Sequence, residues 1–177
     1  MLKLIKPNEI YYNQYKEMMD EWNMEGSRIA PWVLHLKYHT KELFDEMLQR
    51  VYEVERGENL GEFASSTTYW LYDDENNKII GASNLRHYLT ENEDALLWGH
   101  IGYGIRPSER KKGYATELLK LTLSEAKNRE IDKVLLGAYT GNIGSWKAME
   151  KCGGIYKNTI IEKNTGLPVK RYWINIK

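Results

Sequence analysis

One short segment, residues 105–116, constrains the fold of this chain more than any other. It reads IRPSERKKGYAT and joins the end of a β-forming run to the start of a helical pattern. The first turn of a helix leaves backbone N–H groups without partners, at the positive end of the helix dipole. Gly113 allows a turn that a Cβ would obstruct, and Arg110, Lys111 and Lys112 add positive charge. The segment therefore predicts a site for a phosphate or pyrophosphate group.

The glycines of the chain form neither of the two common nucleotide-binding motifs. The segment lacks the Gly-x-x-x-x-Gly-Lys-Ser/Thr pattern of a Walker loop, and Gly99, Gly102 and Gly104 do not give Gly-x-Gly-x-x-Gly. These absences weigh against an NTPase and a dinucleotide dehydrogenase. The four histidines show no zinc-binding spacing such as HExxH, so we expect no metal.

The charges of the chain cancel overall but are divided unequally between its two halves. The 177 residues carry 25 basic and 25 acidic side chains, which argues against a general nucleic-acid binder. Residues 1–100 hold 10 basic and 18 acidic side chains, whereas residues 101–177 hold 15 and 7. We therefore expect the two halves to face different partners.

The pattern of apolar residues predicts a single domain, 1–177, with a mixed α/β sheet. We expect helices over about 8–26, 40–57, 113–127 and 144–151, and strands over about 2–5, 67–72, 78–88, 96–105, 133–139, 155–162 and 169–176. The three consecutive strands before the basic segment predict an antiparallel meander. The lone Cys152 favours a reducing compartment, and no apolar run approaches the length of a membrane span, so we expect a cytoplasmic protein with no membrane partner.

At the basic segment the chain resembles the GNAT superfamily of acyl-CoA-dependent N-acetyltransferases. The family signature, Arg/Gln-x-x-Gly-x-Gly/Ala between the fourth strand and the third helix, is matched by Arg110, Gly113 and Ala115. The resemblance covers about residues 66–176. The residues 106–115 and the closing Arg171-Tyr172-Trp173 are similar to those of a bacterial branch with no assigned acceptor. The resemblance implies a mixed, mostly antiparallel sheet of six to seven strands flanked by about four helices, and acetyl-CoA as cosubstrate.

The resemblance also implies which residues bind the coenzyme. Main-chain amides of the basic segment would hold the pyrophosphate, and the strand before it would pair with the pantetheine arm. Two residues of the next helix would contact the coenzyme across the splayed fourth and fifth strands. The implied cofactor-binding residues are Ile105, Arg106, Arg110, Lys111, Lys112, Gly113, Tyr114, Ala115, Thr116, Asn142 and Ser145.

The resemblance implies that a primary amine, of a small molecule or a peptide, attacks the thioester directly in a ternary complex. A backbone N–H at the strand splay would stabilise the oxyanion. Met149 stands where many family members carry a tyrosine that protonates the leaving thiolate, and methionine donates no proton. Three alternatives follow: another proton donor, a thiolate that leaves unaided, or a coenzyme A binding module without catalysis. Dimers are common in this fold, so a homodimer is left open.

Three residues are candidates for proton transfer. His100 lies five residues before Ile105, where a base could reach the acceptor nitrogen, with a hydrogen-bonded sheet histidine as the alternative. Tyr103 and Tyr172 are candidate proton donors, with core packing as the alternative for each. Other residues have mainly structural interpretations: a solvated helix face for the acidic run 53–58, core packing for Trp32, Trp70 and Trp98, and a structural role for Cys152.

Overall fold

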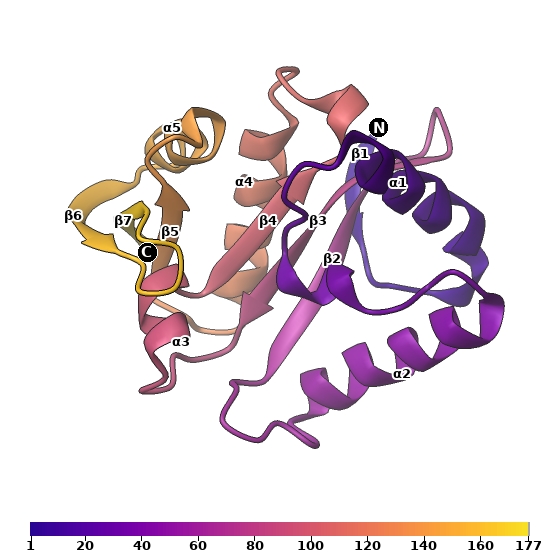
Figure 1. Cartoon of the computed structure of the whole chain (residues 1–177), viewed down its shortest axis with the longest axis horizontal. Coiled ribbons are helices and arrows are strands. Elements are labelled where there is room, and N and C mark those ends of the chain that lie inside the picture. The colour runs from indigo at the N-terminus through magenta and orange to yellow at the C-terminus, as the bar shows by residue number, and fades with distance from the viewer. Residues whose placement is uncertain (177) are drawn as a thin grey trace.

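The computed structural model describes residues 1–176. Its α-helices are α1 (Tyr12–Glu25), α2 (Lys41–Arg56), α3 (Glu93–Trp98), α4 (Tyr114–Asn128) and α5 (Ile143–Lys151). Its strands are β1 (Leu2–Ile5), β2 (Ser66–Asp73), β3 (Lys78–Arg86), β4 (Ile101–Ile105), β5 (Lys133–Tyr139), β6 (Ile155–Ile161) and β7 (Pro168–Asn175). Short 3-10 helices span Glu9–Tyr11, Trp32–His35 and Pro107–Glu109. Figure 1 shows the arrangement of these elements.

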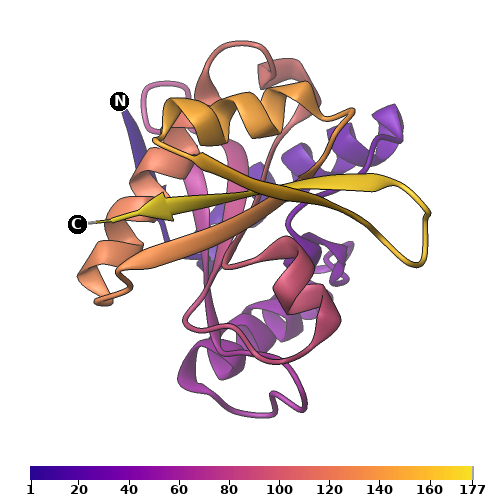
Figure 2. The same ribbon diagram turned by 90° about the vertical axis from the view of Figure 1, so that its left-hand side faces the viewer.

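The strands form two hydrogen-bonded sheets rather than one. The first sheet has the order β1-β2-β3-β4 and the second has the order β5-β7-β6, with antiparallel pairing in both. Figure 2 views the molecule from the side of the second sheet, with α5 above it and α3 below. A single bridge, between Gly99 and Leu136, links the two sheets within the described part of the chain. Gly99 is required there, because a Cβ on it would lie 2.0 Å from the Leu135 carbonyl oxygen.

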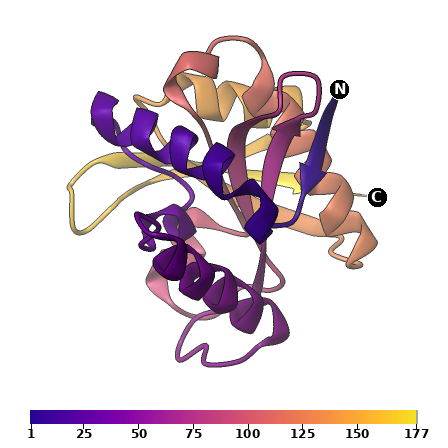
Figure 3. The same ribbon diagram turned by 90° about the vertical axis from the view of Figure 1, so that its right-hand side faces the viewer.

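The two faces of the first sheet bury different helices. Trp70 and Tyr72 of β2 join a cluster with buried residues of α1 and α2, which stand in front of the sheet in Figure 3. Tyr69 and Leu71, one position along the same strand, pack with residues of α4 on the opposite face. The period-2 alternation of side chains along a strand explains this division. The helices therefore form layers on both sides of the first sheet.

Most of the expected elements are confirmed within two or three residues. Thr40 caps α2 by accepting from the Leu43 N–H, and Gly26 and Gly57 end α1 and α2 in the left-handed conformation. Asn8 caps a 3-10 turn instead of an α-helix, so α1 begins only at Tyr12.

One expected element is wrong at its start. The strand expected over 96–105 begins at residue 101, and α3 occupies Glu93–Trp98 before it. The Asn92 side chain accepts from the Asp94 N–H, and Glu93 and Asp94 place negative charge at the helix start, both of which favour a helix. The structure therefore has five α-helices in the described residues, one more than the sequence predicts. None of these helices is long and apolar enough to cross a membrane.

Candidate functional site

Strands β4 and β5 present unpaired main-chain edges to each other. In β4 the even-numbered residues bond to β3: the His100 carbonyl accepts from Arg86 at 2.7 Å, and the Arg106 N–H donates to Ile80 at 3.0 Å. Because main-chain groups alternate along an antiparallel strand, the odd-numbered residues from Ile101 to Ile105 face away from β3. The same alternation holds in β5, where the Thr140 N–H donates to the Pro168 carbonyl of β7. The main-chain N–H and C=O groups of the odd-numbered residues of β5 therefore point toward β4.

His100 closes one end of the cleft between these edges. Its main-chain N–H donates to the Leu135 carbonyl at 2.7 Å, and its Nδ1 accepts from the Leu135 N–H at 3.0 Å. Both edge groups of Leu135 are therefore occupied. No strand bond between β4 and β5 follows in the described residues, so the edge of β4 at Tyr103 stays free for a ligand. Gly137 on β5 is covered by the end of α3, because a Cβ on it would lie 2.5 Å from the Leu97 carbonyl oxygen.

The basic segment forms a loop of outward-pointing amides at the open end of β4. Lys111 and Gly113 have positive φ angles of 62° and 86°, and α4 begins at the next residue, Tyr114. Within residues 1–176, the N–H groups of Lys111 through Ala115 have no hydrogen-bond acceptor, whereas Thr116 donates to the Gly113 carbonyl at 3.0 Å. A Cβ on Gly113 would meet no atom within 4 Å, so the space in front of it is open. These five consecutive amides suit a phosphate group.

Two of the three cations of this loop are held by carboxylates. Arg110 donates to Glu25 at 2.9 and 3.0 Å, to the Ser27 hydroxyl at 2.9 Å and to the Ile105 carbonyl at 3.1 Å. Lys112 contacts Glu109 at 2.8 Å. Of these three cations, Lys111 alone has no hydrogen bond or ion pair within the described residues. From the resemblance we expect all three at the coenzyme. In the structure the Arg110 side chain fixes the loop to the end of α1.

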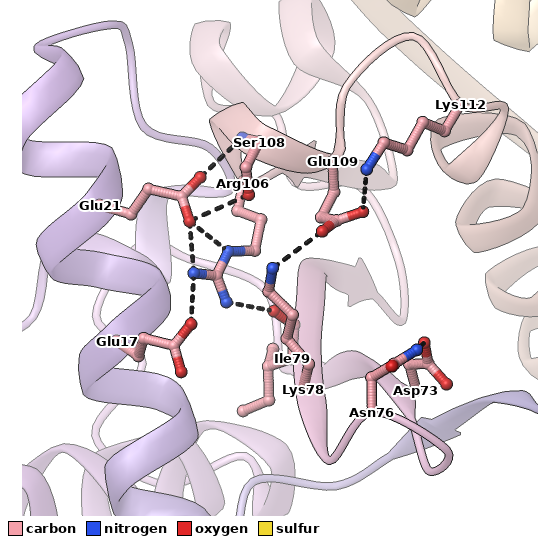
Figure 4. Close-up of polar contacts among 10 residues, drawn as sticks. All are labelled: Glu17, Glu21, Asp73, Asn76, Lys78, Ile79, Arg106, Ser108, Glu109 and Lys112. Carbon is pink, nitrogen blue, oxygen red and sulfur yellow. Dashed lines mark hydrogen bonds and ion pairs between the residues drawn. The ribbon is translucent and has the colours of Figure 1, made fainter.

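Arg106, also expected at the coenzyme, is buried with its side chain 2% exposed. Figure 4 shows its guanidinium group between two carboxylates of α1. It donates to Glu21 at 2.7 Å through Nε, to Glu17 at 2.8 Å and to the Ile79 carbonyl at 3.3 Å. Its main-chain groups are bonded within the protein as well, to Ile80 and Glu109. In contrast to the sequence expectation, Arg106 therefore supports the loop from behind and offers no free group to a ligand.

Glu21 links this pair to the basic loop. Its carboxylate also accepts from the Ser108 N–H at 2.6 Å and from the Ser108 hydroxyl at 3.1 Å. Burial alone would raise the pKa of Glu21, but the bonds from Arg106 and Ser108 outweigh it and lower the pKa. Sequence reasoning missed Glu21. The signal was present, because Glu17, Glu21 and Glu25 recur at four-residue spacing and so share one face of α1.

Asn142 and Ser145 lie at the start of α5, across the cleft from β4, where the resemblance places them. The Asn142 side chain caps the helix by accepting from the Ser145 N–H at 3.2 Å. The Tyr103 hydroxyl reaches the same turn: it donates to the Ser145 carbonyl at 2.8 Å and accepts from the Ser145 hydroxyl at 3.1 Å. Burial raises the pKa of Tyr103, so its hydroxyl stays protonated at neutral pH. Met149, one turn further along α5, is 1% exposed.

His100 is buried at the closed end of the cleft, 8% exposed. Burial and then the charge of Arg86 lower its pKa to about 4, so the imidazole is neutral at pH 7. A neutral imidazole with so low a pKa is a weak base, and its Nδ1 is already occupied by Leu135. In the structure, His100 therefore closes one end of the cleft through its hydrogen bonds to Leu135.

The remaining candidates lie outside the cleft. The Tyr172 hydroxyl donates to Glu150 at 2.9 Å, and the acidic run is paired through Glu55 with Lys6 at 2.6 Å. Trp70 is in the core, whereas Trp32 is 70% exposed, against the expectation of core packing. In the part of the chain that the structure describes, no three His, Cys, Asp or Glu side chains gather as a metal site.

Comparisons with known proteins give a family and a fold. A family model described as an acetyltransferase (GNAT) domain matches residues 8–155. The spermidine/spermine N-acetyltransferase SpeG of Vibrio cholerae, in mutant form, is similar with a TM-score of 0.65 at 17% identity, over 99% of this chain and 95% of that chain. No curated protein matches by sequence.

Two further solved structures are similar. The ribosomal-protein-S5-alanine acetyltransferase of Vibrio fischeri has a TM-score of 0.70 at 15% identity, over 99% and 92% of the two chains. RimL, a ribosomal L7/L12 α-N-protein acetyltransferase in complex with coenzyme A, has a TM-score of 0.71 at 13% identity, over 98% and 93%. At these identities the likeness shows the fold.

The buried ion pair of Arg106 makes a prediction about stability. Replacing it in Arg106→Met leaves the partly buried Glu21 carboxylate without its cation, which costs about 3 kcal/mol in the free energy of unfolding. Urea denaturation measures this. The control Arg56→Met removes a solvent-exposed pair with Glu58 and should leave the free energy of unfolding nearly unchanged. Equal losses in the two variants would contradict the role given to Arg106.

The low pKa of His100 makes a prediction about pH. The unfolded chain binds a proton near pH 6.5 that the folded protein takes up only near pH 4, so stability falls as the pH drops through this window. His100 should account for up to about 3 kcal/mol of the loss between pH 7 and pH 4. Urea denaturation of His100→Gln at both pH values should show a correspondingly smaller loss than the unmodified protein. An unchanged loss would rule out the buried neutral imidazole.

Proposed function

The chain belongs to the GNAT acetyltransferase family, and from this premise we propose that it transfers an acetyl group from acetyl-CoA to a primary amine by direct attack in a ternary complex. The observation that carries the proposal is the run of five amides, Lys111 to Ala115, without acceptors at the mouth of a cleft whose β4 edge is free. A pyrophosphate group fits these amides, and an extended amide-containing arm fits the cleft.

Different residues of the cleft would bind different parts of the coenzyme. The amides at the start of α4 would bind the pyrophosphate, with the unpaired ammonium group of Lys111 beside them. The pantetheine arm would pair with the free edge of β4 at Ile101 and Tyr103, since the Ile105 carbonyl is already bonded to Arg110. Asn142 and Ser145 would border the arm from α5.

Chemistry would take place near the closed end, where the arm meets His100. A free edge N–H of Ile101 or Tyr103 points into the cleft and would stabilise the oxyanion of the tetrahedral intermediate. Since the pKa of His100 is about 4, the acceptor amine would lose its proton to water rather than depend on this imidazole as a base. His100 would then orient the edge on which the thioester lies.

We assign proton donation to Tyr103, because position 149 carries a methionine that has no proton to donate. Its hydroxyl lies at Ser145, one helical turn before Met149 on the same side of α5. The hydroxyl is protonated at neutral pH and needs only to rotate its proton from the Ser145 carbonyl toward the departing sulfur. The Ser145 hydroxyl donates a hydrogen bond to the Tyr103 oxygen at 3.1 Å.

The acceptor is a primary amine of a small molecule or a peptide. Two of the similar structures carry names that specify spermidine and a ribosomal protein, which both present amines. The single free cysteine suits a reducing bacterial cytoplasm. A coenzyme A binding module without catalysis is the alternative, because Met149 supplies no proton. Release of free thiol in the presence of an amine library separates the two, since such a module releases none above background.

Calorimetric titration with acetyl-CoA tests the proposed site. The Gly113→Glu variant places a negative charge in the open space of the loop and should abolish binding that the unmodified protein shows at tens of micromolar, roughly 10⁻⁵ M. Gly57→Glu is the matched control, because Gly57 also has a positive φ, 83°, and open space, but ends α2. Loss of binding in both variants, or in neither, would contradict the site.

Steady-state kinetics test the proton donor. Tyr103→Phe should lower kcat by about 10²-fold or somewhat less, with little change in the dissociation constant of acetyl-CoA, because the hydroxyl acts on the departing thiolate. The control Tyr172→Phe removes a buried hydroxyl bonded to Glu150 and should leave kcat within about twofold. If Tyr103→Phe keeps full kcat, the thiolate leaves without help from this residue.

A further inference from the structure

The guanidinium group of Arg28 lies in a corner formed by two aromatic rings. Its Cζ is 4.9 Å from the centre of the Trp98 ring and 4.6 Å from the centre of the Tyr139 ring. The two ring centres are 5.1 Å apart, with an angle of 77° between the planes. Each ring presents electron density to the cation, which is the arrangement that binds guanidinium and ammonium groups in proteins.

A buried carboxylate forms the third side of this corner. Glu162, 9% exposed, accepts hydrogen bonds from the hydroxyl groups of Tyr139 and Thr165. The bonds from Thr165 and Tyr139 lower the pKa of Glu162, and the charge of Arg28 lowers it further, so the carboxylate is ionised at neutral pH. We call Trp98, Tyr139 and Glu162 the cation corner.

The cation corner lies beside the cleft, on the face away from α5. Along β5, Leu136 and Ala138 pack into the core shared with α4 and α5, so Gly137 and Tyr139 point to the opposite face. The chain after α1 crosses β4 on that face. A Cβ on Gly104 would lie 2.3 Å from the Ala30 carbonyl oxygen. From this crossing Arg28 reaches over to Tyr139 at the end of β5.

Arg28 is held there only by the rings and the field of Glu162. Within residues 1–176 its guanidinium group makes no hydrogen bond and no ion pair within 4.0 Å, and the residue is exposed. A cation–π contact at an exposed position is worth only about fivefold in an equilibrium constant. A cation brought by a ligand can therefore take its place.

We propose that the cation corner is a subsite for a positive charge of the acceptor, and that Arg28 occupies it until a cationic acceptor displaces it. The inference rests on the proposed transfer to an amine and narrows the substrate class. The acceptor is an amine that carries a second positive group, an ammonium or a guanidinium. The attacking nitrogen loses its proton, whereas the second group keeps its charge in the corner.

Calorimetry with 4-aminobutylguanidine tests the subsite, because this probe joins a primary amine to the group that Arg28 itself carries. It is titrated into the full chain with and without saturating coenzyme A. Arg28→Ala should bind the probe about fivefold more tightly than the unmodified protein, since no residue has to be displaced. Adding Glu162→Gln to Arg28→Ala should weaken binding about tenfold. N-Butylurea, which has the shape of butylguanidine but no charge, should not distinguish the variants.

Several results would overturn the subsite: no probe binding under either condition, an affinity of Arg28→Ala equal to or below that of the unmodified protein, or no loss with Glu162→Gln. If Glu162→Gln fails to fold, Tyr139→Leu in the Arg28→Ala background provides the same test by removing one ring. Acetyl-CoA titration of the same samples separates this inference from the proposed function. If the probe binds but acetyl-CoA does not, only the proposed acetyl transfer is contradicted. If acetyl-CoA binds but the probe does not, only the subsite is contradicted.

Discussion

Two hydrogen bonds between His100 and Leu135 fix the point at which β4 and β5 diverge, and the cleft depends on this divergence. They occupy both edge groups of Leu135, and one of them uses an imidazole nitrogen in place of a main-chain oxygen. The side chain keeps the two strands from continuing as an ordinary ladder, so β4 and β5 diverge and leave unpaired edges. An edge inside a protein must find partners for its N–H and C=O groups, and a coenzyme with amide groups along its arm supplies them.

The first helix holds the other end of this cleft in place. Arg106 fixes the end of β4 to Glu21, and Arg110 fixes the basic loop to Glu25, so two turns of α1 carry the loop on which the phosphate would bind. These cations serve the site by placing unpaired amides rather than by touching the ligand. The same helix leads into the segment that carries Arg28 across the acceptor face. The proposed coenzyme and acceptor sides are thus joined through α1, whose Glu17, Glu21 and Glu25 pair with Arg106 and Arg110.

Local signals in the sequence predicted the parts of this structure that depend on local physics. Gly113 with its flanking cations indicated the amide loop, and Thr40 and Gly57 marked the ends of α2. The sequence could not show where side chains go after folding. Arg106 looked like a ligand contact but is buried, and the sequence could not show this because its two carboxylate partners lie 85 and 89 residues away in the chain. Helix α3 was missed because Leu96 to Trp98 also suits a strand, and the Asn92 cap was not recognised.

Amide hydrogen exchange with and without coenzyme A tests the central claim most directly, because it reports on the atoms that define the cleft. The account predicts slower exchange on binding at the amides of Lys111 to Ala115 and at the edge amides of Ile101 and Tyr103. The amides of α2, on the other side of the first sheet, should not change. Coenzyme A that binds while the loop and the β4 edge exchange at their unliganded rates would contradict the account.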